Sequence, residues 1–201
     1  MKKKIKLYDS TLRDGAQTKG VNFSLNDKLK IMSLLDEIGI DYIEGGWPGA
    51  NPTDNVFFQK LPKLSNSKAV AFGMMRKFGK SSQNDPGLNA VLNSGVSTVC
   101  LVGKSWDFHV KNALKMPLNK NLDMISDTIA FSSKRVDEVL FDAEHFFDGY
   151  KNNKEYSLNC IKRAYDAGAN WIILCDTNGG TLPHELENIF NEVKKVVPES
   201  M

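Results

Sequence analysis

Short apolar segments rich in β-branched residues alternate along this chain with longer segments of helical, amphipathic pattern. The segments with strand character cover residues 5–9, 42–44, 69–73, 98–102, 136–142 and 171–175. The segments with helical character cover residues 25–38, 54–59, 86–93, 122–131, 155–167 and 183–196. A strand followed repeatedly by a helix predicts parallel strands joined by helical crossovers.

Three glycines mark the expected ends of helices in this series. Gly39, Gly95 and Gly168 each lie just before the next predicted strand, where a left-handed residue commonly ends a helix. No shift in composition and no linker interrupts the series, so we expect residues 1–201 to form a single catalytic barrel domain that is truncated at its C-terminal end.

The positions of the polar residues favour a barrel over a doubly wound open sheet. Polar residues follow the predicted strands one after another: Asp9 with Arg13 and Asp14, Glu44, Arg76, Lys104, Asp142 with Glu144, and 176–178. An open sheet would gather such residues at one crevice, and its dinucleotide-binding forms carry a GxGxxG turn, whereas residues 11–17 read TLRDGAQ. The fold class predicted is therefore α/β, an incomplete (β/α)8 TIM barrel with about six βα units and without strands seven and eight.

Charge and cysteine content exclude several classes of function. The chain has 26 basic and 24 acidic residues, mixed along its length except for the lysines at 2–4, so we expect no nucleic-acid partner. Cys100, Cys160 and Cys175 are widely spaced among apolar residues, which is typical of reduced, buried thiols in a cytoplasmic protein. We also expect no membrane contact, because no apolar run is long enough to span a bilayer and the N-terminal segment is too polar for a signal peptide.

The first candidate site is the segment 9–17, which directly follows the first predicted strand. A carboxylate at a strand end can bind a hard divalent cation, and the adjacent Arg13 offers positive charge to an oxygen that becomes negative during a reaction. The alternative reading of Arg13 and Asp14 is a surface ion pair.

Two more candidate sites follow later strands. Asp142 and Glu144 are two residues apart, so both can face one side of a strand, and Glu144 there can serve as an acid or a base. His145 would point to the opposite side if the strand continued that far, or it would be a hydrogen-bonded structural histidine. The segment 174–181 brings Asp176 and Thr177 together beside two glycines, and could equally be a turn that caps the next helix.

These segments together resemble a known enzyme family. The matching segments are 10–17 (STLRDGAQ), 42–49 (YIEGGWPG), 103–107 (GKSWD), 142–150 (DAEHFFDGY) and 175–184 (CDTNGGTLPH). They resemble the isopropylmalate and homocitrate synthase family of metal-dependent (β/α)8-barrel acyltransferases, in particular its citramalate synthase branch, across essentially the whole chain.

The resemblance implies a condensation of acetyl-CoA, the co-substrate, with a 2-oxo acid, as in the biosynthesis of isoleucine or leucine. In such a Claisen-type reaction an enolate formed from acetyl-CoA attacks the ketone of pyruvate, and the thioester is then hydrolysed. The resemblance gives Arg13 the role of stabilising negative charge, Glu144 a role in proton transfer and Asp14 the role of metal ligand. It places Thr177 on the substrate carboxylate, and it makes Gln17 and Glu44 further substrate-site residues that support Arg13 and the metal.

The same resemblance raises expectations about the metal, the partners and completeness. An oxygen-rich site favours Mg²⁺ or Mn²⁺ over Zn²⁺, and a full-length member would be a homodimer. The family's His-x-His metal motif on the seventh strand is missing, since the only histidines are His109, His145 and His184. We therefore expect an inactive or weakly active fragment. The alternatives are an aldolase or lyase of the same superfamily, and a non-catalytic remnant that pairs with a separate second half.

Overall fold

The computed structural model describes residues 5–198. The strands are β1 (Tyr8–Asp9), β2 (Tyr42–Gly46), β3 (Lys68–Met74), β4 (Thr98–Lys104), β5 (Glu138–Glu144) and β6 (Trp171–Leu174). The α-helices are α1 (Leu25–Ile38), α2 (Pro52–Gln59), α3 (Pro86–Leu92), α4 (Asp107–Asn112), α5 (Leu118–Ser132), α6 (Phe146–Asn152), α7 (Lys154–Asp166) and α8 (Pro183–Val196). Two 3-10 turns, η1 (Gly15–Gln17) and η2 (Ser82–Asn84), complete the described elements.

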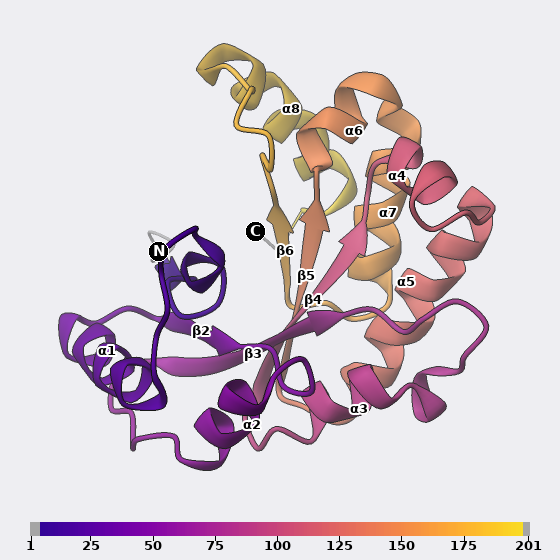
Figure 1. Ribbon diagram of the computed structural model, residues 1–201. Helices are drawn as coiled ribbons and strands as arrows, with labels where there is room; N and C mark the ends of the chain where they lie inside the picture. The colour runs from indigo at the N-terminus through magenta and orange to yellow at the C-terminus, as the bar shows by residue number, and fades with distance from the viewer. Residues whose placement is uncertain (1–4, 199–201) are drawn as a thin grey trace. The chain divides into compact units, whose positions relative to one another are not determined.

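The hydrogen-bonded order of the strands follows the order of the chain from β1 to β6 (Figure 1). A doubly wound sheet reverses its order at a switch point, and this sheet has no such reversal among the described strands. The backbone forms two compact units: one contains residues up to 73 together with 85–100, and the other contains 74–84 together with residues from 101 onward.

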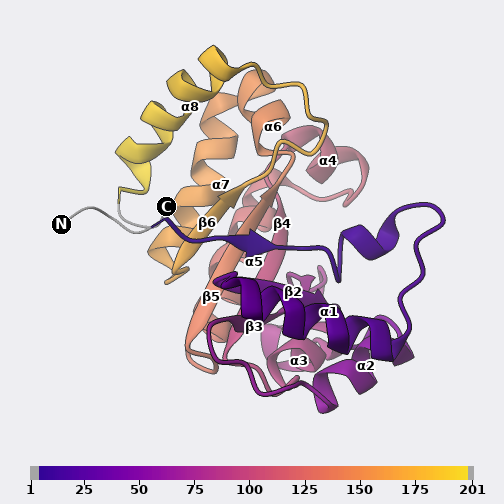
Figure 2. The ribbon, with the colours of Figure 1, turned by 90° about the vertical axis from the view of Figure 1, so that its left-hand side faces the viewer.

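In the first unit, helix α1 has the bounds that its sequence predicts. Ser24 caps its start: the Ser24 hydroxyl accepts from the amide of Asp27, and the Asp27 carboxylate accepts from the amide of Ser24. Gly39 ends the helix in the left-handed conformation, with φ of 88°. In Figure 2 the chain runs from β1 through a wide excursion, which includes η1, before it enters α1.

Strand β2 lies between β1 and β3 and is parallel to both. Its register against β3 shifts between Glu44 and Gly46, which is the mark of a β-bulge. A Cβ atom on Gly45 would lie 2.4 Å from the ring of Phe57 in α2, and one on Gly46 would lie 2.6 Å from the carboxylate of Asp54. The two glycines therefore let α2 approach the strand closely, and Asp54 forms a buried ion pair with Lys28.

In the second unit, α5 and α7 lie side by side (Figure 1), and both contact β5. Strands β5 and β6 are parallel, with Leu140 opposite Trp171 and Ala143 opposite Leu174. Fully buried side chains from these elements form the core of this unit: Phe141, Ile125, Ile129 and Ile161. The apolar faces of α5 and α7 thus pack inside this unit, as expected of amphipathic helices.

Several predicted boundaries were wrong, each for a local reason. Strand β1 includes only Tyr8 and Asp9, and the preceding Ile5 and Leu7 are exposed. Strand β5 begins two residues later than predicted, because the amide of Val136 still bonds back to the carbonyl of Ser132 in a turn after α5. Helices α4 and α6 were not predicted, since each has only six or seven residues and follows a strand directly.

The three cysteines are free thiols, as predicted, although only Cys100 and Cys160 are buried and Cys175 is half-buried. Burial raises the pKa of the Cys160 thiol to about 12, so this group stays protonated at neutral pH. Among the described helices, none combines the length and the apolar character that crossing a membrane requires.

Candidate active site

The segment after β1 forms a tight turn that places Arg13 and Asp14. The carbonyl oxygen of Ser10 accepts hydrogen bonds from the amides of Arg13, Asp14 and Gly15, at 3.1, 2.8 and 3.2 Å. The Asp9 carboxylate accepts from both the amide and the hydroxyl of Thr11, so it stabilises the start of the turn. The backbone of this segment is therefore fixed by its own hydrogen bonds.

Arg13 contacts two carboxylates and one aromatic ring within the first unit. Its Nε donates to Oε2 of Glu44 at 2.7 Å, and its Nη1 donates to Oδ1 of Asp14 at 3.1 Å. The guanidinium carbon lies 3.9 Å from the centre of the Phe72 ring, a cation–π contact. The carboxylates thus hold the edge of the planar guanidinium, and the Phe72 ring covers one of its faces. These contacts leave the guanidinium little rotational freedom.

Glu44 is a buried carboxylate, with 1% of its surface exposed. Besides Arg13, it accepts a hydrogen bond from the hydroxyl of Tyr8 on the neighbouring strand, at 2.8 Å. Burial of this hydroxyl, with smaller contributions from Cys100 and Glu44, raises the pKa of Tyr8 well above its usual value. Tyr8 therefore remains a hydrogen-bond donor to Glu44.

Asp14 and Gln17 are the exposed members of this group. The side chain of Asp14 is 65% exposed, so one carboxylate is open to a cation. A divalent cation needs several ligands, and within residues 5–198 no group of three or more His, Cys, Asp or Glu side chains is arranged to hold one. A complete metal site is therefore not formed by the residues that the structure describes.

In the second unit, Lys104 at the end of β4 forms an ion pair with Glu144 at the end of β5. Both side chains are half-buried. The hydroxyl of Ser105 donates to the backbone carbonyl of Glu144 at 2.7 Å, which joins the two strand ends a second time. Glu144 thus lies beside a fixed positive charge.

His145 does not continue strand β5, which ends at Glu144. It adopts the left-handed conformation, with φ of 53° and ψ of 37°, and it directly precedes helix α6. Its Nδ1 lies 3.0 Å from Oδ2 of Asp148, so the reading of His145 as a hydrogen-bonded histidine fits the structure. Its ring lies edge-on to the ring of His109, with 4.6 Å between the ring centres.

Thr177 and Asp176 belong to the loop that follows β6. The hydroxyl oxygen of Thr177 accepts a hydrogen bond from the amide of His145 at 2.9 Å, and Thr177 is exposed. Asp176 accepts from both the amide and the hydroxyl of Thr181, and the backbone bond lowers the pKa of Asp176 most strongly. The turn-capping alternative therefore describes Asp176, whereas the Thr177 side chain stays accessible.

His109 lies near His145 and near charged side chains of both signs. Burial lowers the pKa of His109 most, and the neighbouring His145 and Lys104 lower it further, against the opposing effect of Glu144 and Asp148. His109 is therefore a neutral imidazole at pH 7.

Comparison with known proteins decides the family. The HMGL-like family model matches residues 4–201. The chain belongs to the HMGL-like family.

Relatives and solved structures agree with this membership. The chain is 52% identical over 197 residues to (R)-citramalate synthase of Aquifex aeolicus, covering 97% of this chain and 37% of that protein. It is 49% identical over 193 residues to (R)-citramalate synthase of Geobacter sulfurreducens, with 95% and 37% covered. The chain therefore spans little more than a third of the length of these relatives.

The backbone is similar to the hydroxymethylglutaryl-CoA lyase of Pseudomonas aeruginosa, with a TM-score of 0.78 and 18% identity, covering 97% of this chain and 65% of that one. The lyase of Acinetobacter baumannii, solved with coenzyme A and 3-methylmalate, gives a TM-score of 0.75 at 16% identity, with 96% and 63% covered. Together with the strand order, this similarity confirms the predicted fold class, an incomplete (β/α)8 barrel.

Within this HMGL-like chain, the structure groups the predicted residues in two sets. Arg13 contacts Asp14 and Glu44 in the first unit, whereas in the second Glu144 ends β5 and Thr177 follows the adjacent strand β6. Gln17, in η1, is exposed, and its backbone amide donates to the carbonyl oxygen of Asp14 at 2.9 Å.

Tyr8 and Lys104 were not predicted as site residues, although they contact Glu44 and Glu144, and the left-handed turn at His145 was not predicted either. A usable signal existed for Lys104, because a lysine and a glutamate end consecutive parallel strands and so lie next to each other.

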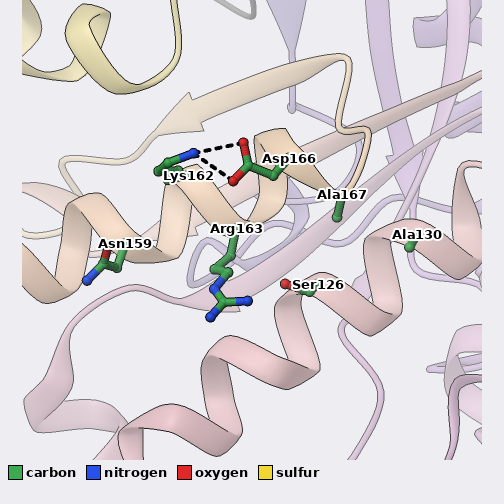
Figure 3. Close-up of a pocket in the computed structure, with 7 residues that line it drawn as sticks. All are labelled: Ser126, Ala130, Asn159, Lys162, Arg163, Asp166 and Ala167. Atoms are coloured by element: carbon green, nitrogen blue, oxygen red, sulfur yellow. Dashed lines mark hydrogen bonds and ion pairs between the residues drawn. The ribbon is translucent and has the colours of Figure 1, made fainter.

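A hollow of about 470 Å³ lies between helices α5 and α7 (Figure 3). Ser126 lines it from α5, and Asn159 and Arg163 line it from α7, where Lys162 also pairs with Asp166. It includes none of the residues predicted for the active site of this family member.

Proposed function

We propose that this chain is the N-terminal part of an acyltransferase that condenses acetyl-CoA with pyruvate to form citramalate. The observation that carries the proposal is the 44–52% identity to five (R)-citramalate synthases over 91–97% of the chain. Identity to 2-isopropylmalate synthases is lower, at 27–30%. The coenzyme A bound to a structural neighbour supports a CoA thioester as one of the substrates.

The reaction requires removal of a proton from the methyl group of acetyl-CoA. The resulting enolate carbon forms a bond to the ketone carbon of pyruvate, and the ketone oxygen takes up a proton. Water then cleaves the thioester and releases CoA as a thiol.

We assign the proton transfer to Glu144, whose carboxylate is half-buried beside Lys104. Arg13 stabilises oxygen that becomes negatively charged, since its guanidinium is already oriented by Glu44 and Phe72. Thr177 binds the substrate carboxylate through its exposed hydroxyl.

Gln17 and Glu44 are the other two residues that we assign to substrate binding, in different ways. Glu44 orients Arg13 from a buried position, and Gln17 offers an exposed amide in the same segment as Arg13. We also infer a divalent cation, Mg²⁺ or Mn²⁺ rather than Zn²⁺, with Asp14 as one ligand. The homodimer remains the assembly that we expect of the full-length enzyme.

The test is release of CoA thiol from acetyl-CoA with pyruvate and Mn²⁺. It compares this chain with a fusion of the chain to the remaining part of the Aquifex aeolicus relative. We expect pyruvate-dependent thiol release from the fusion, with weak or no release from the chain alone. 2-Oxobutyrate and longer 2-oxo acids serve as competing substrates, and a preference for one of them would revise the substrate.

A lyase would behave differently in this assay. It would form acetyl-CoA from a 3-hydroxyacyl-CoA and would not consume acetyl-CoA with pyruvate. A fusion that is folded by circular dichroism, yet releases no thiol with any 2-oxo acid, would refute the acyltransferase proposal.

A further inference from the structure

The turn between β5 and α6 depends on a single residue in an unusual conformation. His145 has positive φ without being glycine, which among the described residues is true otherwise only of Lys115. A side chain disfavours this conformation, and asparagine tolerates it better than most other residues do. Such a residue persists only where its surroundings hold it, and it often marks a functional site.

The left-handed turn points two consecutive amides at the segment that follows β6. The amide of His145 donates to the hydroxyl oxygen of Thr177 at 2.9 Å, and the amide of Phe146 donates to the carbonyl of Cys175 at 3.1 Å. Because the Thr177 oxygen accepts this bond, its hydroxyl hydrogen is free to be donated elsewhere. Thr177 is exposed, so a ligand can receive that hydrogen.

The imidazole of His145 holds the same loop through a carboxylate. Oδ2 of Asp148 lies 3.0 Å from Nδ1 of His145, and it also accepts from Nδ2 of Asn178 at 3.0 Å. An ionised carboxylate only accepts hydrogen bonds, so Nδ1 carries the proton. The residue after Thr177 is thus tied to the helix that begins directly after His145.

We propose that His145 is a positioning residue that orients Thr177 as a hydrogen-bond donor to a carboxylate oxygen of the substrate. Its backbone amide fixes the hydroxyl oxygen, and its side chain fixes the loop through Asp148 and Asn178. The inference rests on the proposed function, in which Thr177 binds the 2-oxo acid. It adds that one turn, at His145, fixes the positions of both the adjacent Glu144 and the carboxylate-binding Thr177.

The first test measures the contact itself and requires no turnover. Amide hydrogen exchange of His145 is followed by NMR in the 201-residue chain and in two variants. Thr177→Ser keeps the acceptor, so we expect unchanged protection. Thr177→Val removes the acceptor, and we expect exchange of this amide to become about tenfold faster or more. Equal protection in Thr177→Val and the wild type would overturn the proposal.

The second test separates positioning from a purely structural role by steady-state kinetics of the fusion enzyme. We expect His145→Ala to raise KM for pyruvate about tenfold, the equivalent of one lost hydrogen bond, and to change kcat by less than about threefold. His145→Asn tolerates the left-handed turn and retains a donor, so it should recover most of the lost affinity. His184→Ala, at an exposed histidine in α8, is the matched control and should leave both constants unchanged.

The outcomes of the two tests separate this inference from the proposed function. A fusion without activity, combined with the expected exchange pattern, would refute the proposed function and leave the His145–Thr177 contact established. Turnover with an unchanged KM in His145→Ala, or a loss confined to kcat, would refute the positioning role while the proposed function stands.

Discussion

The Nε atom of Arg13 lies 2.7 Å from Oε2 of Glu44, so a buried carboxylate is paired with the guanidinium that we assign to charge stabilisation. Removing one partner of such a pair leaves an uncompensated charge in a place that water does not reach. We expect Arg13→Met to lower the free energy of unfolding by about 3 kcal/mol. Urea denaturation measures the change.

The double variant Arg13→Met/Glu44→Gln is the control for that experiment. It removes both charges, so we expect it to be more stable than Arg13→Met alone. A double variant that is less stable than Arg13→Met would mean that Glu44 stabilises the fold independently of Arg13.

Asp14 is expected to affect catalysis rather than stability, because its side chain is 65% exposed. In the fusion enzyme, Asp14→Ala should reduce Mn²⁺-dependent turnover at least about 100-fold, with little change in the melting temperature. Asp123→Ala, at a carboxylate that is 54% exposed on α5, is the matched control. Comparable activity in both variants would remove Asp14 from the site.

Gly46 is expected to tolerate no side chain, for two reasons that can be separated. Its φ is 151°, and a Cβ there would lie 2.6 Å from the Asp54 carboxylate. Gly20 has a φ of 88° with open space around it, so Gly20→Ala measures the backbone cost alone, about 1 kcal/mol. We expect Gly46→Ala to cost about 1–3 kcal/mol more than Gly20→Ala by urea denaturation. Equal costs would show that Asp54 moves aside freely.

His109 is expected to make stability depend on pH in the weakly acidic range. Its folded pKa is lowered, chiefly by burial, so the unfolded chain binds the proton more readily. This contribution to stability is complete above the unfolded pKa of about 6.5, and it is lost as the pH falls from there toward the folded value. NMR titration of the His109 ring measures the folded pKa directly.

Lys104→Met tests the electrostatic part of that shift. The variant removes a positive charge that lowers the pKa of His109, and it leaves the negative charge of Glu144 without its lysine partner. Both changes favour the protonated imidazole, so we expect the pKa of His109 to rise toward its usual value. A fall in this pKa would contradict the arrangement of charges described for the second unit.

Much of the fold follows from local sequence signals. The capping box of Ser24 and Asp27 and the left-handed Gly39 define α1 on both sides, which explains why its predicted bounds were correct. Helix α6 has no such signals: it begins after a histidine whose left-handed conformation depends on partners across the fold. The amide of His145 finds its acceptor, Thr177, 32 residues later.

The candidate site likewise has one part that local sequence determines and one part that depends on distant partners. The turn at Arg13 and Asp14 is local, since the Ser10 carbonyl organises it, and it was recognised as a candidate from its motif. The pairing of Glu144 with Lys104 joins residues 40 positions apart, so it depends on which strands are neighbours. Sequence periodicity gives the strands, whereas the choice of partner comes from their order in the sheet.

Gly45 and Phe57 occupy what is in effect one shared volume. The strand has no side chain at position 45, and the fully buried ring of the helix residue fills that space, within 2.4 Å of where a Cβ would lie. A side chain at position 45 therefore requires a smaller side chain at position 57, and neither position can gain volume alone. We expect Phe57→Leu to recover stability that Gly45→Ala loses. Substitutions at these positions in the strand and the helix should therefore occur together.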